Sequence, residues 1–68
     1  MEMDKAIDMM DALSEEGYDA RLEEGYSGRG MYGDETTAVV SDANPEQAKE
    51  AFPQGFRKDN LGMDYIYY

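Results

Sequence analysis

The side chains of this chain that could do chemistry are mostly carboxylates. Its 68 residues include sixteen Asp and Glu against six Lys and Arg, so the formal net charge is −10 at pH 7. Four of the acids, Asp4, Asp8, Asp11 and Glu15, recur at steps of four, three and four residues, which would place them in one row along a helix. Such carboxylates can act as an acid and base pair, bind hard cations, or form an anionic face for a basic partner.

Acid and base catalysis is the least favoured of these three roles. Two catalytic carboxylates need a cleft in which one is desolvated and the other is not, and a chain of 68 residues is too short to form a deep one. The chain has no histidine and no cysteine, which excludes an imidazole base, a thiolate nucleophile and the usual zinc sites. We therefore expect a protein that is not an enzyme and needs no cofactor.

No segment has the pattern of a metal or phosphate site. The densest set of oxygen ligands is Gly33-Asp34-Glu35 with Ser41-Asp42, and it does not form a twelve-residue calcium loop. The segment Gly28-Arg29-Gly30 lacks the lysine and hydroxyl residue that follow the glycines of a phosphate loop, so we interpret it as a hairpin turn. The sequence predicts no metal site, and adventitious cation binding is favoured over a built one. An acidic cation-binding module is the third and weakest alternative function.

A helix over residues 4–16 is needed to position the carboxylate row. Its apolar stripe is expected to consist of residues spaced by three and four, namely Met3, Ile7, Met10 and Leu13, with Ala6 beside them. Gly17 is suited to the left-handed conformation that ends a helix.

Two strands are expected to follow this helix. Residues 18–23 alternate apolar and polar side chains, so Tyr18, Ala20 and Leu22 should face the helix. Residues 36–40 are rich in β-branched side chains and predict the second strand, with a turn centred on residues 27–30 between the two.

A second helix and a last strand complete the chain. Asn44 is the expected N-cap, Pro45 takes the first helical position, Gln47 completes a capping box, and Pro53 ends the helix. Residues 54–60 are expected to form a polar loop that Phe56 anchors, and residues 61–68 a third strand.

This order predicts a single α+β domain over residues 1–68. The helix, strand, strand, helix, strand sequence is expected to give a three-stranded, mainly antiparallel sheet with both helices packed on one face. We expect the third strand to lie beside the first, because that placement keeps every pairing antiparallel.

The charge balance also predicts where the chain acts. Residues 1–17 contain acids where a signal peptide would have a basic start and an apolar run, and no apolar stretch approaches the roughly 20 residues that cross a bilayer. A cytoplasmic location is therefore expected. The negative charge repels nucleic acid and anionic membranes, and favours a basic protein surface as the partner.

The predicted partner-binding residues combine the acids of the first half of the chain with the turn. Carboxylates on a helix face recur about every 5–6 Å, a spacing comparable to that of DNA phosphates. Arg29 at the turn either orients the partner or only hydrates the turn, and Tyr32 is a candidate interface anchor. The full set is Asp4, Asp8, Asp11, Glu15, Glu16, Asp19, Glu23, Glu24, Arg29, Tyr32, Asp34 and Glu35. The same acids could serve only to hydrate the surface, and the residues leave both interpretations open.

Three segments resemble small proteins encoded by phages and prophages. They are Gly-Tyr-Asp-Ala-Arg at residues 17–21, Tyr-Ser-Gly-Arg-Gly-Met-Tyr-Gly at residues 26–33 and Asp-Asn-Leu-Gly-Met-Asp-Tyr-Ile-Tyr at residues 59–67. The resemblance brings no catalytic residue. It implies a virus-encoded inhibitor in the host cytoplasm, of the anti-CRISPR and DNA-mimic class, whose partner is a nucleic-acid-binding host defence protein. The alternative is an acidic, halophile-adapted interaction domain without mimicry.

Overall fold

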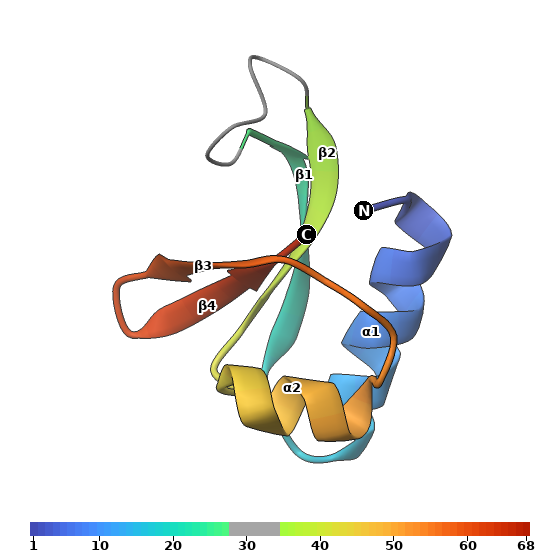
Figure 1. Cartoon of the computed structure of the whole chain (residues 1–68), viewed down its shortest axis with the longest axis vertical. Helices are drawn as coiled ribbons and strands as arrows, with labels where there is room; N and C mark the ends of the chain where they lie inside the picture. The colour runs from blue at the N-terminus through green and yellow to red at the C-terminus, as the bar shows by residue number, and fades with distance from the viewer. Residues whose placement is uncertain (28–34) are drawn as a thin grey trace.

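The computed structural model describes residues 1–27 and 35–68. Most of these residues form two helices and a four-stranded antiparallel sheet (Figure 1). The α+β class is therefore confirmed. The elements in chain order are α1 (Met3–Glu15), β1 (Ala20–Tyr26), β2 (Thr36–Ser41), α2 (Pro45–Ala51), β3 (Lys58–Leu61) and β4 (Asp64–Tyr67).

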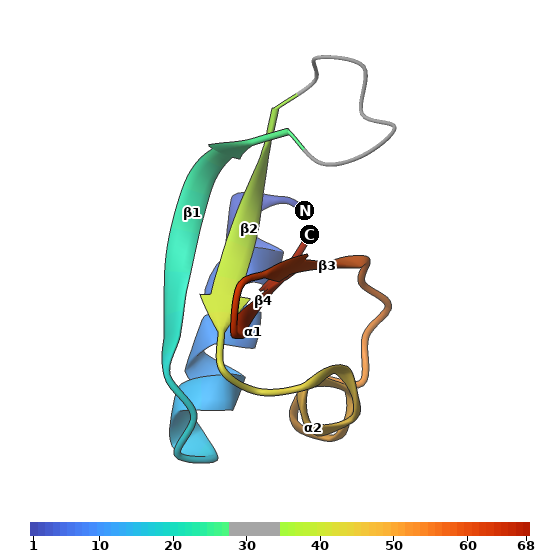
Figure 2. The same cartoon turned by 90° about the vertical axis from the view of Figure 1, so that its left-hand side faces the viewer.

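Helix α1 lies along the β1–β2 hairpin and buries a different stripe from the predicted one (Figures 1 and 2). Its buried side chains are Ala6, Met9 and Leu13, whereas Met3 and Ile7 are 36% and 37% exposed, so the prediction was wrong for these two. Ala6, Met9 and Leu13 lie on one side of the helix, and this side faces the β1–β2 hairpin. Gly17 ends the helix as expected, with a φ of +90°.

The β1–β2 hairpin confirms the predicted facing of the first strand. Ala20 lies opposite Ser41 and Leu22 opposite Val39, and both side chains pack against the same core as α1, together with Tyr18. The predicted turn at residues 27–30 lies outside the described residues from Gly28 onward.

Helix α2 begins with the predicted capping box. The Asn44 side chain accepts a hydrogen bond from the Gln47 backbone N–H at 2.8 Å, and the Gln47 side chain accepts one from the Asn44 N–H at 2.9 Å. The helix ends at Ala51, just before Phe52 and Pro53. It is a short element whose start is determined locally.

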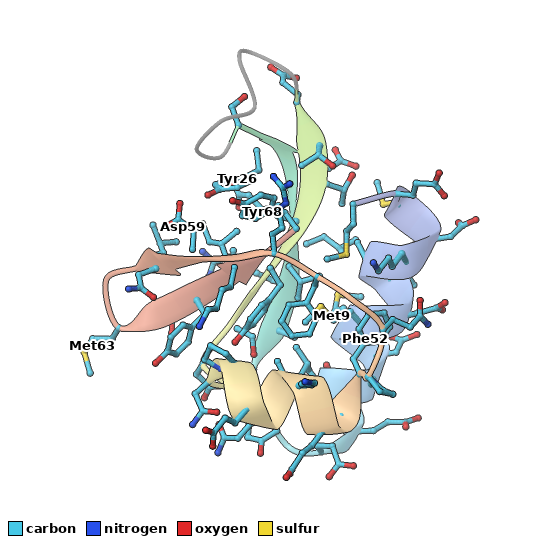
Figure 3. All side chains as sticks on the ribbon, in the orientation of Figure 1. Met9, Tyr26, Phe52, Asp59, Met63 and Tyr68 are labelled. Atoms are coloured by element: carbon cyan, nitrogen blue, oxygen red, sulfur yellow. The ribbon has the colours of Figure 1, made fainter. Side chains whose placement is uncertain are left out.

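The last part of the chain is a hairpin and not a single strand. Residues 58–60 were expected to continue a loop and residue 61 to begin the last strand, but residues 58–61 form β3. The chain then turns at Gly62, whose φ of +61° suits a tight turn. Met63 projects from the tip of this hairpin and is 96% exposed (Figure 3). The sheet thus has four strands, one more than predicted.

The strand order also differs from the prediction. The order is β1-β2-β4-β3, so the last strand pairs with β2 and does not lie beside the first strand. The additional hairpin explains the difference, because the return strand β4 can then pair with β2 in the antiparallel sense while β3 takes the outer edge.

The sheet separates a main core from a smaller cluster. The main core joins side chains from both helices to one sheet face, and Met9 and Phe52 belong to it (Figure 3). Helix α1 contacts β1 and β2, whereas α2 packs mainly against α1. Tyr67 is fully buried in the main core, and its hydroxyl donates a hydrogen bond to the Ala43 carbonyl. On the other face, between the two hairpins, Tyr26 and Tyr68 cover a small cluster of buried side chains: Ala38, Val40 and Ile66.

Candidate functional site

The predicted carboxylate row is present on α1. Its four members are all exposed, and they lie on the side of the helix opposite Ala6, Met9 and Leu13. We call this the carboxylate face of α1 and define it by Asp4, Asp8, Asp11 and Glu15. With a rise of 1.5 Å per residue, the face extends over about 17 Å of helix axis.

No cation of the described chain neutralises this face. Lys5 is the only basic residue in α1, and its ammonium donates instead to the Gly55 carbonyl. None of the four carboxylates forms an ion pair with another residue in the described ranges 1–27 and 35–68. The repulsion between neighbouring acids is therefore retained, at a cost of roughly 0.2–0.5 kcal/mol per pair.

The other predicted acids are exposed but lie on other parts of the molecule. Glu16 follows α1, and Glu35 precedes β2. Glu23 lies opposite Ala38 in the sheet, on the face away from the helices, and Glu24 follows it in β1. Arg29, Tyr32 and Asp34 lie outside the described residues.

Asp19 belongs to a separate acidic hollow of about 270 Å³. Its backbone N–H donates to the Asp42 carboxylate at 3.0 Å, and its carbonyl accepts a hydrogen bond from the Ser41 hydroxyl. Asp64 and Arg21 complete the charged lining of this hollow. No group of three acids within the described ranges is arranged to hold a metal ion. We therefore assign Asp42 a structural role at the end of β2.

A second and larger hollow was not predicted. Its volume is about 450 Å³, and Lys5, Arg57, Phe56 and Tyr68 are among the side chains that line it. Phe56 and Arg57 were expected to lie in a polar loop, and no functional role was predicted for Lys5. The scarcity of cations in the chain was the only signal that could have drawn attention to them.

The Met1 ammonium lies at the edge of the same hollow. It donates hydrogen bonds to the Thr36 hydroxyl and to the Thr37 carbonyl, the latter at 2.8 Å. Burial lowers the pKa of this ammonium, the positive charge of Lys5 lowers it further, and Glu2 acts in the opposite direction. Positive groups are thus crowded together in an otherwise acidic protein.

Comparisons with known proteins add no family to these observations. A scan against protein-family models, a search of curated proteins and a search of solved structures found no match. No helix in the described part of the chain is long and apolar enough to cross a membrane.

Proposed function

We propose that this chain is a non-enzymatic inhibitor that places the carboxylate face of α1 on a basic, nucleic-acid-binding surface of a host defence complex of the CRISPR type. It acts there as a DNA mimic. One observation carries the proposal: the four carboxylates are exposed in one row, opposite the buried side of the helix, with no ion pair to any other described residue.

The charge density of the face supports mimicry of a nucleic-acid strand. Four carboxylates extend over about 17 Å of helix axis. One strand of B-DNA has one phosphate per 3.4 Å of axis, or about five over the same length. A groove that accommodates a DNA strand between lysines and arginines would therefore meet a similar number of negative charges along α1.

The unrelieved repulsion within the face also favours an interaction role. Bringing Lys and Arg side chains of a partner beside the row removes the like-charge repulsion that the free protein retains. The attraction acts over a Debye length of about 8–10 Å, so it should speed the encounter and weaken as salt is added.

The test is a variant in which Asp4, Asp8 and Asp11 are all replaced by Asn. We expect native protein to block DNA binding by a purified CRISPR effector complex, excess DNA to relieve the block, and the triple variant to lose at least about tenfold in inhibitory potency. Electrophoretic mobility shift with labelled target DNA measures this loss.

A matched control removes the same number of charges elsewhere. Glu46 and Glu50 are exposed, Asp64 is half-buried, and all three lie outside α1 and outside the predicted partner-binding set, so their joint replacement by Gln, Gln and Asn changes the net charge equally. The control variant should inhibit like the native protein. Equal potency of native protein and the α1 triple variant, with unchanged circular dichroism, would rule out the proposed mechanism.

Met3 and Ile7 favour a second candidate function, an acidic interaction domain without mimicry. They leave an apolar strip, 36% and 37% exposed respectively, on the same helix as the carboxylates. Protein interfaces commonly bury such apolar area within a polar rim. A partner complex that survives excess DNA but is lost with Ile7→Ser would establish this candidate in place of the first.

A further inference from the structure

The larger hollow is lined by the positively charged side chains of Lys5 and Arg57. Its described lining contains no Asp or Glu, although the chain has sixteen. It is formed where the start of α1, the start of β2, the segment before β3 and the last residue come together, and its described lining is Met1, Lys5, Thr36, Gly55, Phe56, Arg57 and Tyr68.

The cations of this hollow have unused capacity to bind an anion. The Lys5 ammonium donates to the Gly55 carbonyl, which leaves two of its three N–H donors. The Arg57 guanidinium forms no hydrogen bond or ion pair with another residue of the ranges 1–27 and 35–68. Because the charges of Lys5 and the Met1 ammonium repel each other, an anion placed between them would stabilise the arrangement.

Two aromatic rings form the apolar part of the lining, and each packs against another aromatic ring of the protein. The Phe56 ring packs edge-on against Tyr67, and the Tyr68 ring packs tilted against Tyr26, both with centroids 5.0 Å apart. Figure 3 shows Tyr68 beside Tyr26. Both Phe56 and Tyr68 are only half-buried, so part of each side chain remains accessible.

The backbone holds Arg57 opposite Tyr68. The Arg57 N–H donates to the main-chain oxygen of Tyr68, which belongs to the terminal carboxylate, at 2.8 Å, and the Tyr68 N–H donates to the Arg57 carbonyl at 2.9 Å. This pair extends the β3–β4 ladder by one step. Arg57 and Tyr68 are thus neighbours in the sheet, and both line the hollow.

We propose that this hollow binds a nucleoside monophosphate, with the phosphate between Lys5 and Arg57 and the base against Phe56 or Tyr68. The volume of about 450 Å³ falls within the range of small-molecule sites. Arg and Lys are the usual phosphate-binding side chains, and aromatic rings stack on bases of any sequence. A single nucleotide is favoured over a polynucleotide, because the net charge of −10 repels a polyanion.

The experiment is a titration of ¹⁵N-labelled protein with adenosine monophosphate, followed by amide chemical shifts at low salt. We expect the largest shifts at Thr36, Gly55 and Arg57, and binding tighter than that of inorganic phosphate or adenosine alone. The proposal would be overturned if the chemical-shift changes were confined to the part of α1 that follows Lys5. Equal affinity for inorganic phosphate and for the nucleotide would also overturn it. Tighter binding of a short single-stranded oligonucleotide would do so as well.

Arg57→Gln provides the decisive variant and Lys58→Gln its control. Arg57 and Lys58 are both exposed and adjacent in the sequence, and each substitution removes one positive charge. Lys58, however, does not line the hollow. We expect Arg57→Gln to weaken nucleotide binding about tenfold and Lys58→Gln to change it less than about twofold. Equal effects of the two substitutions, in variants with native-like amide spectra, would contradict a site at Arg57. Because this site shares no residue with the carboxylate face, its failure would leave the proposed inhibition untouched.

Discussion

Tyr67 shows how one residue connects the sheet to the segment before α2. Its ring is fully buried in the main core, and its hydroxyl donates to the carbonyl of Ala43, which is also buried. The sequence predicted a strand over residues 61–68, but its bulky side chains fall on both faces and do not indicate which face is buried. Pairing with Val39 on β2 places Tyr67 on the helix-covered face, so the ambiguity was settled by a partner strand far away in the sequence.

Replacing Tyr67 with Phe should destabilise the fold by about 1–3 kcal/mol, because the buried Ala43 carbonyl loses its donor. For a domain of this size, each kcal/mol corresponds to roughly 4–8 °C in Tm, which thermal unfolding followed by circular dichroism can measure. Tyr65→Phe is the matched control, since the Tyr65 hydroxyl makes no hydrogen bond within the ranges 1–27 and 35–68. Equal Tm values for the two variants would contradict this role of the hydroxyl.

Tyr67 should also make stability depend on pH in the alkaline range. Burial raises its pKa to about 12, with a smaller contribution from Tyr65, whereas an unfolded tyrosine ionises near pH 10. The unfolded chain therefore loses this proton first. The resulting stabilisation is complete below about pH 10 and is lost as the pH rises toward 12. Urea unfolding across this range should show a smaller decline for Tyr67→Phe than for the native protein.

At the scale of the elements, the β3–β4 hairpin is where local reasoning failed. Residues 54–60 were expected to form a loop and residues 61–68 a single strand, whereas the chain turns at Gly62, which has a positive φ, and forms a hairpin. This one turn changes both the strand count and the strand order. It also brings Arg57 alongside Tyr68 and so completes the larger hollow.

Gly62→Ala should cost about 1–2 kcal/mol, because an L side chain is strained in the left-handed conformation even where space is open. A Cβ at Gly62 would meet no atom within 4 Å, so the cost comes from the backbone alone. Gly55→Ala is the control, since a Cβ there is equally unobstructed and its φ is not positive. We expect no loss of stability, or a small gain, in chemical unfolding of Gly55→Ala. A similar cost at both glycines would contradict the assignment of the turn.

At the scale of the whole molecule, the charge of −10 acts on folding as well as on binding. Self-repulsion destabilises the compact state, and salt relieves it by shortening the Debye length from about 30 Å at 0.01 M to about 3 Å at 1 M. We expect Tm to rise with salt over this range. The Asp4, Asp8 and Asp11 triple Asn variant should be more stable at low salt and respond less to added salt.

The salt dependence of Tm also distinguishes two explanations of the acidic composition, namely halophilic adaptation and an interaction role. A Tm that does not change with salt would contradict significant self-repulsion. A native chain that folds only at molar salt would favour halophilic adaptation over an interaction role for the carboxylate face. Differential scanning calorimetry at matched pH measures both the native protein and the triple variant.

The sequence by itself determined the features that depend on neighbours within a few residues. Helical spacing predicted α1 and its carboxylate face, Asn44 and Gln47 predicted the start of α2, and β-branching predicted β2. These features are local because the residues that interact in a capping box or along a helix face are only three or four positions apart in the sequence.

Only the tertiary structure decided which side of α1 is buried, which strands are neighbours and where the cations gather. Met3 and Ile7 are exposed because the sheet contacts α1 through Ala6, Met9 and Leu13. Lys5 and Arg57 line one hollow because β3 and β4 return the chain to the start of α1. Contacts between segments far apart in the sequence have no local signature, and they are set by how the two hairpins and two helices share their apolar surfaces.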